Sequence, residues 1–418
     1  MMCFKTLENN PLVTKNNSVK SLIINDYEIQ FNKSIDEIDS TLFSTERDIF
    51  LTPNFLKVLE NAPPKSFQFC YLTFFHKNQF VGFMACEIKH FKTEESLNLS
   101  NVDSYILLAV RKWLAKQVNF QTLIVGNLLL TGEHSYHLDN SLISEADRKF
   151  LMIKGIKHAK KMLSEENIVI KSVFIKDFFE SQFTVGADGT KQIPDFGEGY
   201  NEFQVEPNFI FDIQPEWRVF DDYLKALASK YRVRAKRAFK KLEGIEKKEF
   251  NEERIIAHKL KINELYQTIR SKSAFNLVDL HEDYFIELKR RLEDKFRLFG
   301  YFSPQGELVG FYSTIDNGAE LDAHYLGYEA EWNYSHQIYL NFLFDIVQVG
   351  IETGSRRIIF GRTANEIKSS IGAVAHEMYL YMRHENTIIN RLLPYFLRIL
   401  KPREIWLPRQ PFKENSTD

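Results

Sequence analysis

The chain has 418 residues, of which 44% are hydrophobic and 26% are charged, and its formal net charge is −2. This length predicts two or three domains, and the composition excludes a disordered or fibrous chain. Because the net charge is near zero, any attraction to nucleic acid or anionic lipid must come from a local basic patch. The sequence shows no secretory signal and no run of about 18 apolar residues, so we expect a cytoplasmic protein.

The first half of the chain predicts a hairpin followed by a strand, a helix and a strand. Residues 67–91 read as two β-strands joined by the polar turn HKNQ. We then expect a strand over 120–132, a helix over about 144–165 and a strand over 168–178. A last strand over 200–213 closes this half. Because a strand–helix–strand step implies a parallel, right-handed crossover, this half is predicted to be a mixed α/β sheet.

The second half predicts the same order of elements. A hairpin is expected over 295–316, and then a strand over 318–328, a helix over about 334–353 and a strand over 355–363. The closing strand is expected over 376–384. Each half therefore reads as one complete sheet with its own helix.

A nearly identical phrase occurs in both hairpins, FVGFMACEI at 80–88 and LVGFYSTID at 308–316. Gly82 and Gly310 in these phrases predict a bulge or a close approach of backbone. Since the flanking elements also repeat in order, we interpret the phrase as a sign of domain duplication. The alternative is chance similarity between two buried strands.

A basic helical segment joins the halves. We place the boundary near 215, which predicts an N-terminal domain over 20–215 and a C-terminal domain over 216–412 that includes a joining helix over 216–248. Four basic residues of this helix recur at helical spacing, and they are Lys230, Arg234, Arg237 and Lys241. This stripe is either a solvated face or an anion-binding surface for tRNA, a nucleotide-linked precursor or lipid headgroups.

The element order, the duplicated Val-Gly-Phe strand and the segment FGRTANEIKSSIGA at 360–373 together resemble the GNAT acyltransferase fold. Two such units joined by a basic helix resemble the Fem-type aminoacyl transferases and the BioF-like acetyltransferase domains, over roughly residues 20–410. The resemblance implies an α/β fold of two tandem GNAT-like domains, each a mixed β-sheet flanked by helices. It also implies an N-acyltransferase that moves an acyl group from acyl-coenzyme A to an amine. The alternatives are a Fem-type transferase that uses aminoacyl-tRNA on a peptidoglycan precursor, and a catalytically inactive binding protein.

Candidate catalytic residues lie on two strands of the second half. Alternation along ELDAHYLGY places Asp322 and His324 on one face, where a neutral imidazole can accept a proton from a substrate ammonium. In HEMYLYMRH the same alternation groups Tyr381 with Tyr379 and Arg383. The resemblance implies that such a phenol returns a proton to the leaving thiolate, and the alternative for this aromatic stripe is packing.

Candidate cofactor-binding residues precede the helix of the second half. The loop 327–339 stands where GNAT proteins carry a glycine-rich turn that holds the pyrophosphate of coenzyme A. Ser335 is expected to cap the helix, whose first amides favour an anion. His336 and Gln337 stand where the family usually has the glycine, so this chain departs from the family pattern here.

A second set of binding candidates follows the strand over 355–363. FGRTANEIKSS is similar to the FGRG…YKxxFG segment of the family, with Ile367 in the usual place of Tyr. Arg362 and Lys368 suit a phosphate or carboxylate group of a substrate. Thr363 or Asn365 is expected to cap a short helix at this point.

The remaining motifs mainly exclude functions. His134 and His137 lack further ligands at metal spacing, and the three cysteines form no CxxC motif, so we expect no metal site. Neither GxGxxG, a Walker loop nor GxSxG occurs, which argues against a Rossmann protein, a P-loop NTPase and an α/β-hydrolase. The tail over 387–412 mixes apolar and basic residues, as in a peripheral membrane contact or in a helix kinked at Pro394 that covers the second domain.

Overall fold

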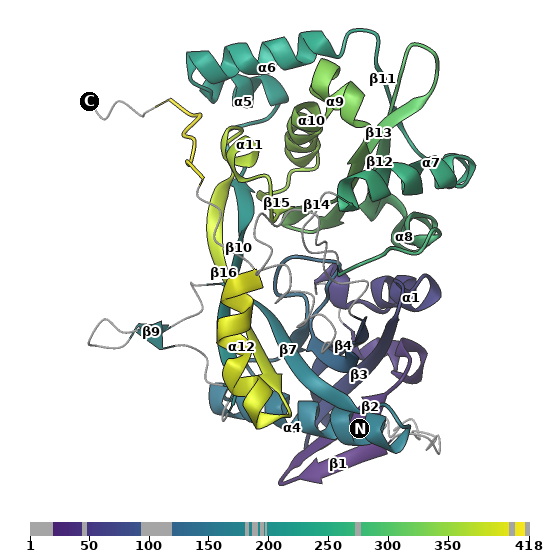
Figure 1. The fold of residues 1–418 in the computed structure, drawn as a ribbon, viewed down its shortest axis with the longest axis vertical. Helices are drawn as coiled ribbons and strands as arrows, with labels where there is room; N and C mark the ends of the chain where they lie inside the picture. The colour runs from purple at the N-terminus through teal and green to yellow at the C-terminus, as the bar shows by residue number, and fades with distance from the viewer. Residues whose placement is uncertain are drawn as a thin grey trace, which may run out of the picture.

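The computed structural model describes residues 20–43, 48–92, 119–179, 184–185, 191–192, 196, 199–271, 277–400 and 406–413. A single mixed sheet of 14 strands runs through both halves of the chain, with helices packed against it (Figure 1). The strand order is β1-β2-β3-β4-β5-β7-β16-β10-β15-β14-β13-β12-β11, and β6 pairs with β4. This confirms the predicted α/β class.

The elements of the first half follow the predicted order. The strands are β1 (Lys20–Ile24), β2 (Tyr27–Asn32), β3 (Phe67–His76), β4 (Gln79–Lys92), β5 (Asn119–Val125), β6 (Tyr136–Leu138), β7 (Ile170–Phe179) and β10 (Asn201–Asp212), with a separate pair of β8 (Thr184–Val185) and β9 (Lys191–Gln192). The helices are the 3-10 turns η1 (Ile35–Glu37), η2 (Ser40–Leu42) and η3 (Ile49–Leu51), and α1 (Pro53–Asn61) and α4 (Glu145–Glu165).

The second half adds more helices around its strands. The strands are β11 (Glu246–Glu249), β12 (Phe296–Phe302), β13 (Leu308–Asn317), β14 (Glu320–Tyr328), β15 (Arg357–Gly361) and β16 (Val374–His384). The helices are α5 (Phe220–Ala226), α6 (Ser229–Lys241), α7 (Glu252–Arg270), α8 (Tyr284–Leu292), the 3-10 turn η5 (Glu293–Lys295), α9 (Ala330–His336), α10 (Ile338–Glu352), α11 (Asn365–Ser369) and α12 (Thr387–Leu400).

The two hairpins are built alike, as the repeated phrase predicted. Gly82 lies opposite Phe74, and Gly310 lies opposite Tyr301, and in each hairpin the register shifts at the next position. A Cβ atom on Gly82 would come within 2.3 Å of a Leu138 methyl carbon, and one on Gly310 within 2.9 Å of a ring carbon of Phe342. Both glycines therefore mark a bulge and a close contact, as expected.

The parallel crossovers are also present. In the first half β5 pairs parallel with β7, and α4 connects them. In the second half β14 pairs parallel with β15, and α9 and α10 connect them. Each half therefore contains the predicted hairpin, strand, helix and strand.

Three predicted elements differ in extent. The strand expected over 120–132 ends at Val125, because Gly126 and Gly132 adopt φ of 139° and 130° and the chain between them turns. The helix expected over about 334–353 divides into α9 and α10 at Gln337, which is left-handed (φ 52°). The joining helix expected over 216–248 is two helices, α5 and α6, because the chain between them pairs with the C-terminal segment through Leu227 and Phe412.

The closing strands are exchanged between the halves. We expected β10 to complete the first sheet and β16 the second. Instead β10 pairs with β15, β16 pairs with β7, and β10 and β16 pair with each other in the middle of the sheet. The sheet is continuous as a result. The division of the chain into domains over 20–215 and 216–412 stays a prediction.

Helices of both halves pack together on one side of this continuous sheet. Figure 1 shows α1 and α8 lying side by side at the level where the halves meet. One apolar core joins Phe55 of α1 and Phe83 of β4 to Leu265, Leu288 and Phe311 of the second half. Two other cores lie under α4 and under α10. The shared core fixes the ends of the second-half strands against the first half.

Candidate functional site

The strands β14 and β15 separate at their carboxyl ends. They pair only from Glu320 to Asp322, opposite Arg357 to Ile359. Beyond that point β14 stays with β13, whereas β15 stays with β10. Ligands of open α/β sheets bind outside the carboxyl ends of such diverging strands, so the residues that follow β15 are candidates for a ligand site.

The backbone after β15 is strained. Gly361, Thr363 and Ala364 have φ of 69°, 67° and 53°, in the left-handed region that residues other than glycine rarely adopt. Strain of this kind persists where the surroundings determine it, and it clusters at functional sites. The short helix α11 follows at once. Its N-cap position is Ala364, so the prediction that Thr363 or Asn365 caps this helix is wrong.

Lys368 of α11 is the most unusual charge at this end of the sheet. The residue is 4% exposed, and its Nζ donates to the carbonyl oxygens of Gly361 (3.2 Å) and Arg362 (2.5 Å). Its ammonium lies 5.7 Å from the ring centre of Phe209, and no described carboxylate forms an ion pair with it. Burial lowers its pKa to about 7, although the charge of Glu206 acts in the opposite direction.

Arg362 connects this end of β15 to the first half. Its guanidinium forms an ion pair with the fully buried carboxylate of Asp177, at the end of β7. Glu366, which lies four residues after Arg362, pairs instead with Arg409 at 3.0 Å. Burial raises the pKa of Asp177, but Arg362 and Lys176 outweigh that effect and hold it below its usual value.

A loop of the first half, residues 126–134, closes over these groups. The Gly132 amide donates to Asp177 Oδ2 at 3.1 Å, and Tyr325 of β14 donates its hydroxyl to the Leu129 carbonyl at 3.2 Å. Thr131 Oγ1 lies 3.9 Å from the position that a Cβ on Gly361 would take. The loop therefore contacts β7, β14 and the end of β15, and the candidate site is built from both halves.

Further buried charges support this loop from below. Lys176 Nζ donates to the carbonyls of Asn127 (2.7 Å) and Leu130 (3.0 Å). Glu87 accepts from the Leu128 amide at 2.9 Å, whereas its Oε1 has no partner among the described residues. Burial raises the pKa of Glu87 to about 7. These side chains fix the loop through its backbone.

Asp322 and His324 lie near each other, but deep in the structure. His324 Nδ1 is 3.8 Å from Asp322 Oδ1, and its Nε2 is 2.9 Å from the hydroxyl of Tyr284. The His324 side chain is 1% exposed. The structure thus gives this pair a place in the packing between β14 and α8, and its proton-accepting role stays a prediction.

Tyr381 lies away from that pair. It is buried in the first-half core, against Phe178 and Phe196, and its hydroxyl donates to Glu202 at 3.4 Å. This arrangement corresponds to the packing alternative that the sequence left open. The structure therefore does not bring Tyr381 together with His324, and the role of its hydroxyl toward a leaving group stays a prediction.

The expected coenzyme A loop is arranged differently from the prediction. Ser335 lies inside α9, where its hydroxyl contacts the Glu331 carbonyl (2.9 Å) and His336 Nδ1 (2.7 Å). The N-cap position of α10 is Gln337, so the prediction that Ser335 caps the helix is wrong. The Tyr339 amide at this end donates to the side chain of Asn333 at 2.9 Å. One of the amides expected to bind an anion is therefore already occupied.

The sequence interpretation missed Glu87, Lys176 and Asp177. A signal was present, since all three are charges inside apolar strand sequences, MACEI and FIKDFF. Buried charges are rare unless they are paired or have a function. His134 was considered only as a metal ligand, and in the structure its Nδ1 lies 2.5 Å from Asp48 Oδ2.

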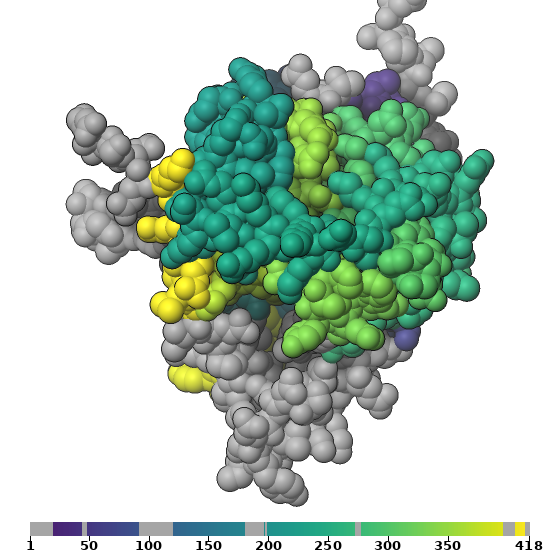
Figure 2. Space-filling model, turned by 90° about the horizontal axis from the view of Figure 1, so that it is seen from above, coloured from purple at the N-terminus to yellow at the C-terminus, as the bar shows by residue number. Residues whose placement is uncertain are grey.

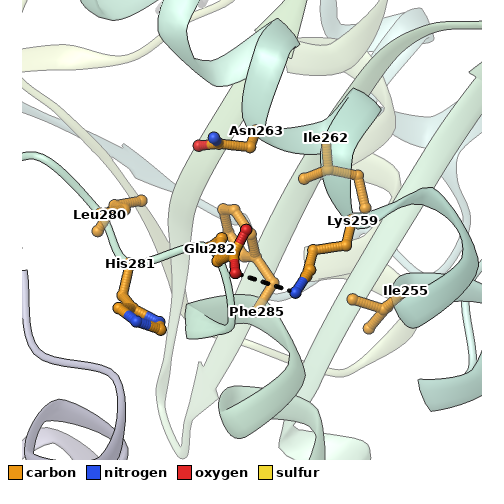
Figure 3. A pocket seen from close by; sticks show the side chains of 8 residues that line it. All are labelled: Ile255, Lys259, Ile262, Asn263, Leu280, His281, Glu282 and Phe285. Atoms are coloured by element: carbon orange, nitrogen blue, oxygen red, sulfur yellow. Dashed lines mark ion pairs between the residues drawn. The ribbon is translucent and has the colours of Figure 1, made fainter.

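A shallow open hollow lies elsewhere, between α7 and the segment that precedes α8 (Figure 3). Figure 3 shows Lys259 reaching toward Glu282 across it, and the two form an ion pair of 3.2 Å. None of the predicted site residues lines this hollow. It is therefore separate from the end of β15.

The helix α6 belongs to the teal part of the face seen in Figure 2, and its sequence is strongly basic. Seven of its 13 residues are Lys or Arg and none is acidic. Tyr231, Ala235 and Ala238 are buried, whereas the predicted stripe is exposed, namely Lys230, Arg234, Arg237 and Lys241. None of the seven basic side chains forms an ion pair with a described residue, so this charge is available to a partner.

Two absences hold for the described part of the chain. It contains no group of three or more His, Cys, Asp or Glu placed to hold a metal ion. None of its helices combines the length and apolar character needed to span a bilayer.

No family model and no curated protein sequence matches the chain. Solved structures of similar fold include FemX, at 11% identity and a TM-score of 0.47, with 90% of this chain and 99% of FemX covered. L-PGS from Bacillus licheniformis is 12% identical, with a TM-score of 0.43 and coverage of 82% and 96%. A tandem GNAT protein from the clavulanic acid biosynthesis pathway is 10% identical, with a TM-score of 0.47 and coverage of 85% and 98%. These are proteins of the kinds that the sequence resemblance names.

Proposed function

We propose that the chain is a transferase that moves an acyl group to an amine at the carboxyl ends of β14 and β15. The observation that carries this proposal is Lys368, a buried ammonium that has carbonyl partners only. An amine whose charged form is held at such a desolvation cost, beside a strained strand end, is typical of a site where a bound negative charge would stabilise the ammonium.

The chemistry of acyl transfer needs few protein groups. The acyl carbonyl must lie close to an unprotonated amine, and donors must face the oxygen that becomes negative in the transition state. In the proposed site Lys368 supplies such a donor from α11. Arg362, held by Asp177, supplies a second cation for a phosphate or carboxylate of the substrates. Thr363 and Asn365 flank these groups, and Asn365 Oδ1 has no partner among the described residues.

Acyl-coenzyme A is the donor that the resemblance implies. Its pyrophosphate would sit at a helix N-terminus, near Ser335, His336 and Gln337 in the second half. The corresponding end of α4 in the first half is capped by Ser144, with Asp147 in its first turn. Since α10 is also partly capped, coenzyme A would have to displace side-chain caps, and this weakens the case for it.

Aminoacyl-tRNA is the second candidate donor, and the unpaired basic surface of α6 favours it. The stripe of 230–241 would contact phosphates of the RNA backbone without reading bases, because few aromatic residues lie between the cations. This version needs no pyrophosphate site at either helix end.

The acceptor amine belongs, in this proposal, to a small molecule or to a cell-envelope precursor. The segment 387–412 supports a contact with the inner face of a membrane, because Ile388, Leu392 and Tyr395 of α12 are exposed beside Arg391. An amphipathic surface of this kind suits peripheral binding to anionic lipid.

The test uses the purified full chain with acetyl-coenzyme A, longer acyl-coenzymes A and aminoacyl-tRNA. Thermal shifts report binding, and mass spectrometry of an added amine mixture reports the amide product. Product from one donor class supports the transferase and identifies the donor. A shift without product from any donor favours the inactive binding protein, and indifference to all donors contradicts the proposal.

A further inference from the structure

Building on the proposed function, we propose that His134 of the first half, held by Asp48, is the proton acceptor of the site formed between the halves. This histidine ends the loop 126–134, in which Thr131 lies beside the end of β15 and the Gly132 amide donates to Asp177. The first half then contributes to the chemistry of the second half, and is more than a degenerate copy of it.

The His134 ring is oriented by a chain of hydrogen bonds. Its Nδ1 lies 2.5 Å from Asp48 Oδ2, and the other oxygen of Asp48 accepts from Asn317 Nδ2 at 2.9 Å. Asn317 in turn accepts from the Ile49 amide at 2.8 Å. A carboxylate at Nδ1 requires the proton on that nitrogen, so the lone pair of the neutral ring lies on Nε2.

The other nitrogen is free to act on a substrate. Nε2 of His134 has no hydrogen-bond partner in the part of the chain that the structure describes, and the side chain is 10% exposed. It lies beside Gly132, where a Cβ atom would come within 2.8 Å of it. A side chain at position 132 would therefore cover this nitrogen.

The same glycine ties His134 to the proposed site. The Gly132 amide donates to Asp177, and Asp177 pairs with Arg362. His324 differs from His134 in the state of its Nε2 and in exposure. Its Nε2 is hydrogen-bonded to the hydroxyl of Tyr284, and its side chain is almost fully buried. Of the two histidines, His134 is the one that a substrate ammonium can approach.

The surrounding charges favour proton uptake. Burial alone would lower the pKa of His134, but Asp48, with Asp322 and Glu320 of β14, raises it above its usual value. Glu133 faces it from its own loop, and burial raises the pKa of that carboxyl to about 7. A base with a raised pKa takes up a proton from a substrate ammonium more readily.

The proposed step conserves atoms and charge. His134 Nε2 takes one proton from the substrate ammonium, which leaves a neutral amine. The amine nitrogen attacks the acyl carbonyl, the new C–N bond forms, and the bond from the carbonyl carbon to the sulfur or oxygen of the donor breaks. The second amine proton goes to that leaving atom. The imidazolium then releases its proton to water.

The first test needs no activity. Diethyl pyrocarbonate acylates a neutral, accessible imidazole nitrogen, and peptide mass spectrometry locates the label. We expect His134 to be labelled, with a rate that rises as pH passes its pKa. His281, which is 42% exposed near Asp283, is the positive control, and His324 is the control that stays unlabelled. Absence of label on His134 would overturn the inference.

The second test uses whichever donor gives product with the full chain. His134→Gln should lower kcat/KM by about 100-fold, within the range of general-base catalysis. Asp48→Asn should move the acidic limb of the pH profile to lower pH, because the loss of the carboxylate lowers the pKa of His134. His281→Gln is the matched control and should leave the rate unchanged.

A purely structural role for His134 gives a different result. His134→Gln would then reduce the melting temperature, and kcat/KM measured well below that temperature would stay near that of the unsubstituted chain with the same pH profile. That outcome overturns the inference but leaves the proposed function standing. A chain without product from any donor contradicts the proposed function, whereas the labelling test still decides whether Nε2 is accessible.

Discussion

Buried charges at the junction of the halves are the main feature at the residue scale. Lys368, Arg362, Lys176, Asp177 and Glu87 lie at or near the ends of strands that belong to different halves. Charges of this kind reduce stability unless partners compensate them. If these charges serve the candidate site, their burial should lower the free energy of unfolding by an amount that can be measured.

Lys368 predicts a pH dependence of stability. The unfolded chain binds the proton with the ordinary pKa of 10.5, whereas the folded chain releases it at about 7. Between pH 7 and pH 10.5, folding therefore releases a proton from Lys368. Over this range the residue makes the free energy of unfolding rise by roughly 1.4 kcal/mol per pH unit. In urea titrations at pH 7 to 9.5, Lys368→Met should lose this slope, so that its stability relative to the unsubstituted chain falls as pH rises. If the stability of the Lys368→Met variant and that of the unsubstituted chain change with pH in parallel, the lowered pKa of Lys368 is contradicted. Lys236→Met, on the exposed face of α6, is the control.

Sequence reasoning reached part of this residue set. Arg362 and Lys368 were predicted from the likeness of 360–373 to a family segment, and both lie at the end of β15. Asp177 was read only as a strand residue, because its partner is 185 positions away and no local pattern encodes that contact. His134 was missed for the same reason, since Asp48 approaches it from a distant 3-10 turn.

At the scale of elements, local periodicity predicted the hairpins, the crossovers and the glycine bulges. It failed where an apolar sequence was held in a loop, as in 126–132, where buried Lys176 binds the carbonyls. It also failed at Gln337, where no glycine or proline marks the break between α9 and α10. The exchange of β10 and β16 was not predictable, because alternation identifies a strand but not its neighbour.

The duplicated glycines give a prediction for the first hairpin. Gly82→Ala would place a Cβ within 2.6 Å of the His137 carbonyl oxygen and 2.3 Å of Leu138. Overpacking of this kind costs about 3 kcal/mol or more when backbone must move. Gly318→Ala is the matched control, since it has φ of 72° and no atom within 4 Å, and it should cost about 1 kcal/mol. Equal losses in urea-induced unfolding would argue against the close contact.

At the scale of the whole molecule, the exchanged strands should make both halves unfold together. Natural probes separate the halves, because the buried Cys70 and Cys86 lie in the first, whereas Trp217, Trp332 and Trp406 lie in the second. In a Cys3→Ser, Trp113→Phe background, thiol labelling and tryptophan fluorescence should give the same urea midpoint. Two separate midpoints would show that the sheet does not couple the halves.

The continuous sheet also explains how a site is shared across the molecule. The strand β7 brings Asp177 of the first half to the level where β15 of the second half ends, and the shared core of α1 and α8 holds the halves in register. A substrate bound near Lys368 would therefore contact a loop of the first half. The first half would therefore be required for the reaction even without a complete reaction centre of its own.

The most direct measurement is the rate of acyl transfer in two variants from different halves, Lys368→Ala and Asp177→Asn. If one site spans the halves, each should lower kcat/KM at least tenfold, below its melting temperature and with the donor that gives product. The exposed Lys236→Ala should keep the full rate. Full activity in both Lys368→Ala and Asp177→Asn would contradict a reaction centre at the end of β15.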